Sequence, residues 1–163
     1  MSQNTWIPVD QLGAEHVFRI HQLRDIEIEY VYQPDGSRDF TKGELQPRTI
    51  TLKTADFNRG FSFDKGAMTT GSFGTPEGRC DISYRDFMGK PSFTKHVGHV
   101  GGSNSGFYDA DKVPFELVKE ADADERKYLV PPAHRVPATL DHVYVVKTLD
   151  GKYAKFIVRK FVK

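Results

Sequence analysis

The sequence predicts an all-β domain, made mostly of antiparallel strands with one short helix. Short runs alternate between apolar and polar residues, turn-forming residues separate these runs, and no long stretch has the apolar period of a helix. The chain has 163 residues, a length that suits one domain. We therefore expect a single β-rich domain over residues 1–163.

The strongest predicted element is a β-hairpin over residues 142–163. Asp150-Gly151 lies between two runs rich in Val, Ile, Phe and Tyr, and Asp-Gly favours a tight turn because glycine accepts a positive φ. One side of the second run holds Ala154, Phe156 and Val158, and the other holds Tyr153, Lys155 and Arg159. Only Ile157 does not fit the alternation. A lone hairpin is marginally stable in water, so upstream strands must pack against this one.

Upstream segments supply the other strands. The expected strands cover residues 17–20, 26–32, 48–53 and 80–84, and residues 60–69 form a second hairpin that turns at 64–66. Alternation and β-branched residues favour these strands. A turn at residues 33–37, which contains Pro34 and Gly36, ends the second of them.

Three segments do not read as strands. Residues 90–106 are rich in Gly, Ser and Asn, and we expect a long exposed loop there, of the kind that often has a function. Residues 113–119 form the best helix, with Pro114 in its first turn and Asp111 placed to cap it. Residues 129–137 contain three prolines and must be extended.

Charge and hydropathy exclude several classes of partner. The net charge is +1, from 23 basic and 22 acidic residues, so nothing draws the chain to nucleic acid or to anionic lipid. No run approaches the roughly 18 apolar residues of a membrane span. The first 18 residues show no signal peptide, because they have neither a basic start nor an apolar core. A cytoplasmic location therefore stays open.

Histidines are the main candidates for chemistry. His96 and His99 form an H-x-x-H pair that could reach one metal ion, or they are simply exposed loop residues. Cys80 is the only cysteine, so a structural zinc site would need distant ligands, and a buried core thiol is the expectation for it. The chain has no nucleophile-elbow or phosphate-loop motif. We expect no enzyme; the alternative is a metal-dependent hydrolase that uses His96 and His99.

Four segments, taken in order, resemble one known family. They are GFSFDKG at 60–66, CDISYR at 80–85, GFYD at 106–109 with FELVKEA at 115–121, and VYVVKTLDGKYAK at 143–155. The chain resembles the HmuY-like family of bacterial haem-binding proteins over about residues 57–162, and the final hairpin is the most specific part.

The resemblance implies a mostly β fold and haem held between two axial histidines. It also implies secretion or association with the outer membrane, with a haem-carrying protein or an outer-membrane receptor as partner. Two departures from the family stand out. Cys80 replaces the family's tryptophan, and the interval 121–140 is too short for the family's haem-carrying hairpin.

The resemblance places His134 near one axial ligand, and the other would come from His96 or His99. Arg135 or Lys95 would lie near the haem propionates, and the metal ligands would be His134 and His99. The predicted function is a non-enzymatic protein that binds haem or another porphyrin. The alternative is a surface-binding or adhesion module of the same fold that has lost the haem site and uses the loop at 90–106.

Overall fold

The computed structural model describes residues 23–56, 59–70, 76–94, 105–128 and 135–162. These residues form three antiparallel sheets, and the largest has five strands in the order β2-β1-β10-β9-β7. Its strands are β1 (Asp25–Gln33), β2 (Arg48–Leu52), β7 (Gly106–Asp109), β9 (Val143–Lys147) and β10 (Tyr153–Val162). The predicted all-β class is confirmed at this level.

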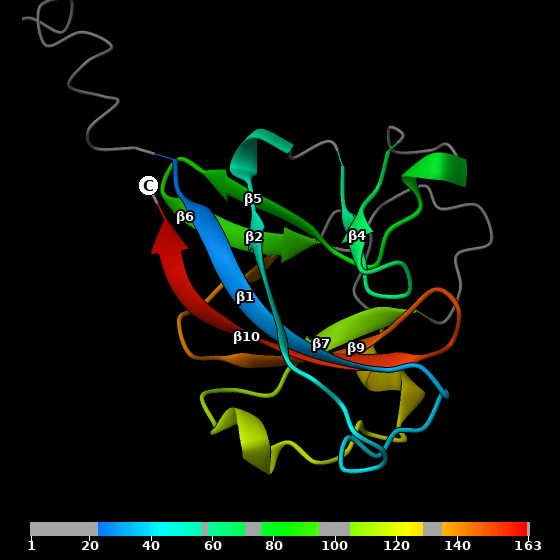
Figure 1. Cartoon of the computed structure of the whole chain (residues 1–163). Helices are drawn as coiled ribbons and strands as arrows, with labels where there is room; N and C mark the ends of the chain where they lie inside the picture. The colour runs from blue at the N-terminus through cyan, green and yellow to red at the C-terminus, as the bar shows by residue number, and fades with distance from the viewer. Residues whose placement is uncertain (1–22, 57–58, 71–75, 95–104, 129–134, 163) are drawn as a thin grey trace, which may run out of the picture.

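Two smaller sheets lie on one face of the large sheet. The first pairs β3 (Phe61–Ser62) with β4 (Ala67–Met68), and the second joins β5 (Ser83–Phe87), β6 (Lys90–Thr94) and β8 (Arg135–Pro137). Connections around residues 34–47 and 110–128 cover the opposite face (Figure 1). The large sheet is therefore the middle layer of three.

The predicted final hairpin is confirmed as β9 and β10, with Gly151 at a φ of +78° in its turn. Its second strand pairs antiparallel with β1 along nearly the whole length of both. The register shifts between Glu27 and Ile28, so that Arg159 is an extra residue in β10. A bulge of this kind bends the strand and increases its twist.

The main core lies between the large sheet and the two smaller ones. Aromatic rings fill its centre: Phe156 stacks on Tyr144 at 5.0 Å between ring centroids, and Phe93 meets Phe156 edge-on at 5.1 Å. The predicted apolar side of β10 faces this core, as Ala154, Phe156 and Val158 all belong to it. Alternation in the sequence identified this face correctly.

A second core lies on the other face and explains why Ile157 does not fit the alternation. Ile157 packs there with Val143, Val145 and Phe115. Since both faces are covered, β9 is buried along four of its five residues, as expected for a strand between two layers. Lys155 also points to this face and is only 6% exposed.

Two of the expected segments differ from the structure. The expected loop over 90–106 is wrong at both ends, because residues 90–94 form β6 and Ser105 and Gly106 are buried. The strand expected at 80–84 begins later, at Ser83. Residues 17–20 and 95–104 lie outside the described residues. The remaining strand predictions hold.

The predicted short helix is also wrong. Residues 115–117 form a single 3-10 turn, and the described residues contain no α-helix. Pro114 precedes the turn without any side-chain cap, and Val118 leaves it with a ψ of 86°. Asp111 does not cap it; its carboxylate accepts a hydrogen bond from Lys112 N–H instead. Burial of Phe115 in the second core fixes this turn instead.

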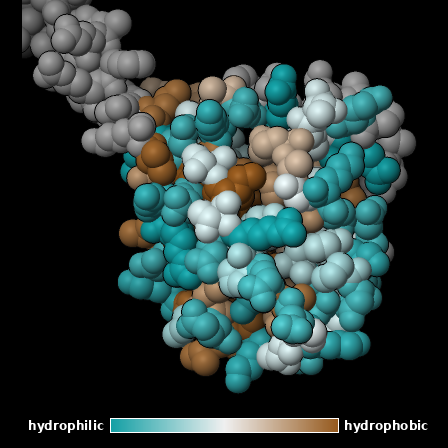
Figure 2. Space-filling view, viewed as in Figure 1, coloured by the Kyte–Doolittle hydropathy of each residue, from teal (hydrophilic) through white to brown (hydrophobic). Residues whose placement is uncertain are grey.

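The face of the molecule shown in Figure 2 is largely polar. In the view of Figure 2, hydrophilic residues cover most of the face and hydrophobic ones form small separate patches. Within the described ranges, no helix is both long and apolar enough to cross a membrane.

Candidate functional site

Of the four residues expected to bind haem, the structure describes one. Arg135 opens β8 and is exposed to solvent. The other three, His134, His96 and His99, lie outside the described residues, so their expected role as ligands stays a prediction.

Arg135 lines a largely apolar pocket of about 630 Å³, which we call the Arg135 pocket. It lies against β6 and β8, and its lining residues are Phe87, Lys90, Pro91, Ser92, Arg135, Pro137 and Ala138. This volume falls within the range of about 300–1,000 Å³ found for small-molecule sites. The two cations of the lining, Lys90 and Arg135, lie beside prolines and an aromatic ring.

Phe87 is the exposed aromatic ring of this pocket. It is 43% exposed, and two guanidinium groups approach its ring: that of Arg85 at 4.7 Å and that of Arg135 at 5.4 Å from the centroid. A cation near a ring face is attracted by the ring's electrons. The Arg135 guanidinium therefore lies against the Phe87 ring at the pocket.

The pairing of β6 with β8 bears on the three histidines that lie outside the described residues. Thr94, the last residue of β6, pairs with Arg135, the first residue of β8. The segment after Thr94 contains His96 and His99, and the residue before Arg135 is His134. The two segments that carry the predicted ligands are therefore attached to Thr94 and Arg135, which are partners in the sheet. The sequence alone did not predict this pairing.

The remaining candidates for chemistry have structural roles. Cys80 is buried, as expected, and burial raises the pKa of its thiol to about 12, so it is not a nucleophile near neutral pH. His142 lies beside β9, where its Nδ1 is 3.0 Å from Asp109 Oδ2. In the part of the chain that the structure describes, no three metal-binding side chains come together.

Asp81 is a buried acid that the sequence reading did not single out. Its two carboxylate oxygens accept hydrogen bonds from Phe63 N–H at 2.7 Å and from Leu149 N–H at 2.9 Å. Burial raises the pKa of Asp81 to about 7. The side chain thus ties the β3–β4 turn to the turn of the final hairpin.

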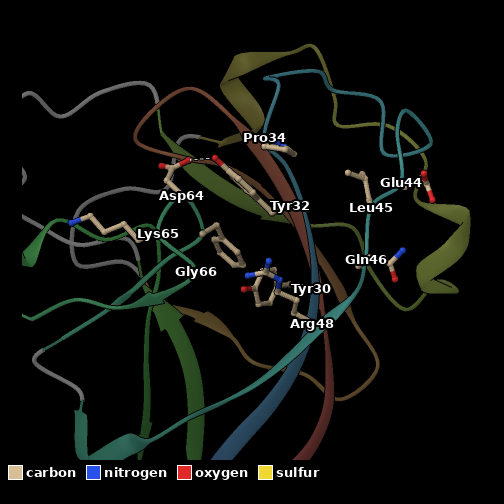
Figure 3. Close-up of a pocket in the computed structure, with 11 residues that line it drawn as sticks. Tyr30, Tyr32, Pro34, Glu44, Leu45, Gln46, Arg48, Asp64, Lys65 and Gly66 are labelled. Atoms are coloured by element: carbon tan, nitrogen blue, oxygen red, sulfur yellow. Dashed lines mark hydrogen bonds between the residues drawn. The ribbon is translucent and has the colours of Figure 1, made fainter.

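A second pocket, of about 390 Å³, lies at the C-terminal end of β1. The sequence reading did not predict it either. We call it the tyrosine pocket, and it is lined by Tyr30, Tyr32, Pro34, Glu44, Leu45, Gln46, Arg48, Phe63, Asp64, Lys65 and Gly66. Figure 3 shows Arg48 beside Tyr30, with the hydrogen bond between Tyr32 and Asp64 at one end. Its residues come from three separate segments, so no sequence motif marks it.

Comparisons with known proteins add no family. No protein-family model, curated protein or solved structure matches this chain.

Proposed function

We propose that this protein is a non-enzymatic binder of a flat, largely apolar molecule that carries anionic groups, with haem or another porphyrin as the ligand. The Arg135 pocket is the observation that carries this proposal. A porphyrin with two carboxylates presents an apolar plane and two negative charges. The pocket offers an apolar lining with two cations, Lys90 and Arg135.

Each part of the pocket has a role in this proposal. Phe87, Pro91 and Pro137 would contact the apolar plane, and exclusion of water by such surfaces favours binding. Arg135 would bind a carboxylate through its planar guanidinium, which can donate two parallel hydrogen bonds. Lys90 would supply a second charge near the rim.

The histidines of the resemblance extend the proposal to the metal. His134 directly precedes Arg135, and His96 and His99 follow Thr94 by two and five residues, so all three belong to segments that adjoin the paired ends of β6 and β8. Imidazole nitrogens are common axial ligands of haem iron. We assign this role to His134 and to either His96 or His99 as part of the proposal.

Two titrations of the whole chain test it: one with hemin followed by its Soret band, and one with metal-free protoporphyrin followed by fluorescence. Both should saturate. Changing Lys90 and Arg135 together to Gln should lower the affinity for both ligands by about tenfold or more, because each substitution removes a charge-assisted contact. His134→Ala should change the absorbance spectrum of the hemin complex and leave the affinity for protoporphyrin nearly unchanged.

A matched control is Arg126→Gln. Arg126 is an exposed arginine that forms an ion pair with Asp124, and it does not line the Arg135 pocket. It should bind both ligands as the unchanged chain does. A hemin titration without a saturable Soret change would refute the proposal, as would equal binding by the Lys90/Arg135 double variant.

A further inference from the structure

The tyrosine pocket points to a second ligand, separate from the one proposed above. We infer that it binds a small aromatic carboxylate of one or two rings, whose acid group is held by Arg48. The inference depends on three features: the arrangement of Arg48 and Tyr30, the aromatic and aliphatic side chains in a lining that is otherwise polar, and the hydrogen bonds that the nearby acid Asp64 already accepts.

Arg48 and Tyr30 face the same side of the sheet. They are direct partners in the register of β1 and β2, and directly opposite residues of paired strands point to the same face. Gly66 of the β3–β4 turn lies above them. A Cβ at Gly66 would be 3.4 Å from Arg48 Nη1 and 3.6 Å from the Tyr30 hydroxyl, so two donors converge where the turn carries no side chain.

The guanidinium of Arg48 is available to an anion. The ion pairs found among the described residues do not include it. Glu44 also lines the pocket, but in Figure 3 its carboxylate points outward, away from Arg48 and Tyr30. A carboxylate fits this place best, because a guanidinium can bind both of its oxygens at once.

The acid inside the pocket, Asp64, already accepts three hydrogen bonds from the protein. Asp64 Oδ1 accepts hydrogen bonds from the hydroxyls of Tyr32 and Thr148, both at 2.8 Å, and Oδ2 accepts one from Asp150 N–H at 3.3 Å. These contacts hold the β3–β4 turn against β1 and the final hairpin. Asp64 therefore shapes the pocket. The other cation of the lining, Lys65, points away from Arg48 and Tyr30 in Figure 3, so Arg48 is the group placed to recognise an anion.

The walls set the size and character of the ligand. Tyr30, Tyr32 and Phe63 bring aromatic surface, and Leu45 and Pro34 add aliphatic surface. The volume of about 390 Å³ is near the low end of the range for small-molecule sites. It suits one or two rings and is smaller than the Arg135 pocket, so the two pockets differ in the ligand that they take.

Calorimetry with the full chain tests this inference through two probes of the same shape. Indole-3-acetate carries the acid group, and indole-3-acetamide is its neutral counterpart. The acid should bind at least about tenfold more tightly, which corresponds to one charge-assisted contact. Glucuronate, an acid without an aromatic ring, should bind more weakly than indole-3-acetate.

Variants assign the effect to Arg48. Arg48→Gln should remove the preference for the acid over the amide, while Arg48→Lys should keep part of it because the charge remains. The control Lys53→Gln removes an exposed charge just beyond β2, outside the pocket lining, and should bind the acid normally. Equal affinity of acid and amide for the unchanged chain would overturn the inference, as would no binding of either, or normal binding of the acid by Arg48→Gln. Hemin binding by Arg48→Gln should be unchanged, which separates this test from that of the proposed function.

Discussion

Lys155 shows how far a single residue can depart from its usual behaviour. Its ammonium donates to the Phe115 carbonyl at 2.6 Å and lies 4.3 Å from the centre of the Phe115 ring. Burial lowers the pKa of Lys155, while Glu116 opposes the shift. The sequence placed this lysine on a polar face, because lysine is almost never fully buried without a partner. In the structure this lysine is buried, because the connection at residues 110–128, which contains Phe115, covers that face of the sheet.

Asp81 gives a prediction at the same scale. Its pKa is about 7 in the folded protein, against 3.8 for the free side chain, so the folded state holds a proton that the unfolded state has released. The free energy of unfolding should therefore fall as the pH rises from about 4 to 7. Asp81→Asn cannot ionise and should remove this part of the pH dependence.

Urea unfolding of both proteins across this pH range measures the effect. The surface acids with lowered pKa values, among them Asp35 and Asp122, act in the opposite direction but are common to both proteins. Their contribution cancels in the difference between the two. Parallel stability curves for the unchanged chain and Asp81→Asn would contradict the prediction.

At the scale of elements, local signals predicted the hairpins well. Asp150-Gly151 and Gly66 both lie in turns where the structure has a positive φ at glycine, and glycine needs no partner elsewhere in the chain to favour such a turn. The alternation within β1 likewise marks the face that is buried, which carries Ile26, Ile28 and Tyr30, because it depends only on neighbouring residues. These elements carry their structural information within a few residues.

The elements that sequence reasoning missed depend on distant partners. β6 has the sequence KPSFT, in which Phe93 is the only large apolar residue and Pro91 removes a donor. It is a strand because β5 and β8 lie on its two sides. Both pockets follow the same rule: Arg48 and Gly66, or Phe87 and Arg135, are far apart in sequence and meet only in the folded chain.

Gly106 supports a prediction about the contact between β7 and the 3-10 helix at Glu125–Tyr128. A Cβ on Gly106 would be 1.5 Å from the carbonyl oxygen of Tyr128, so an alanine there would force two backbone segments apart. Gly106→Ala should lower the free energy of unfolding by about 3 kcal/mol or more. Thermal and urea unfolding measure this loss.

Gly89→Ala is the matched control. Gly89 has a φ of +79° and no atom within 4 Å of an added Cβ, so this change costs only the left-handed backbone, about 1 kcal/mol. If the two variants lost equal stability, the close packing of β7 on Tyr128 would not be the cause.

At the scale of the whole molecule, the ring of Phe156 connects the three sheets. It contacts Phe63 of the β3–β4 turn, Phe93 of β6 and Tyr144 of β9. Phe156→Ala should lower the free energy of unfolding by about 3–5 kcal/mol. The near-ultraviolet and far-ultraviolet circular dichroism of the variant should still change together on heating, because one core serves all three sheets.

Leu117→Ala is the control for this prediction. Leu117 is 65% exposed, and its replacement should change stability by no more than about 0.5 kcal/mol. Separate transitions for the two signals in Phe156→Ala would show that the small sheets unfold independently of the large one.

The pairing of β1 with β10 also governs the order in which the chain can fold during synthesis. Glu29 and Arg159 meet across this pair although 130 residues separate them. A ribosome that adds about 5–20 residues per second needs roughly 6 to 26 s to make that stretch. Throughout this time β1 has been made while its central partner, β10, has not. The nascent chain therefore exposes an apolar strand edge, and it needs a chaperone or rapid translation more than a protein of the same size built from local contacts would.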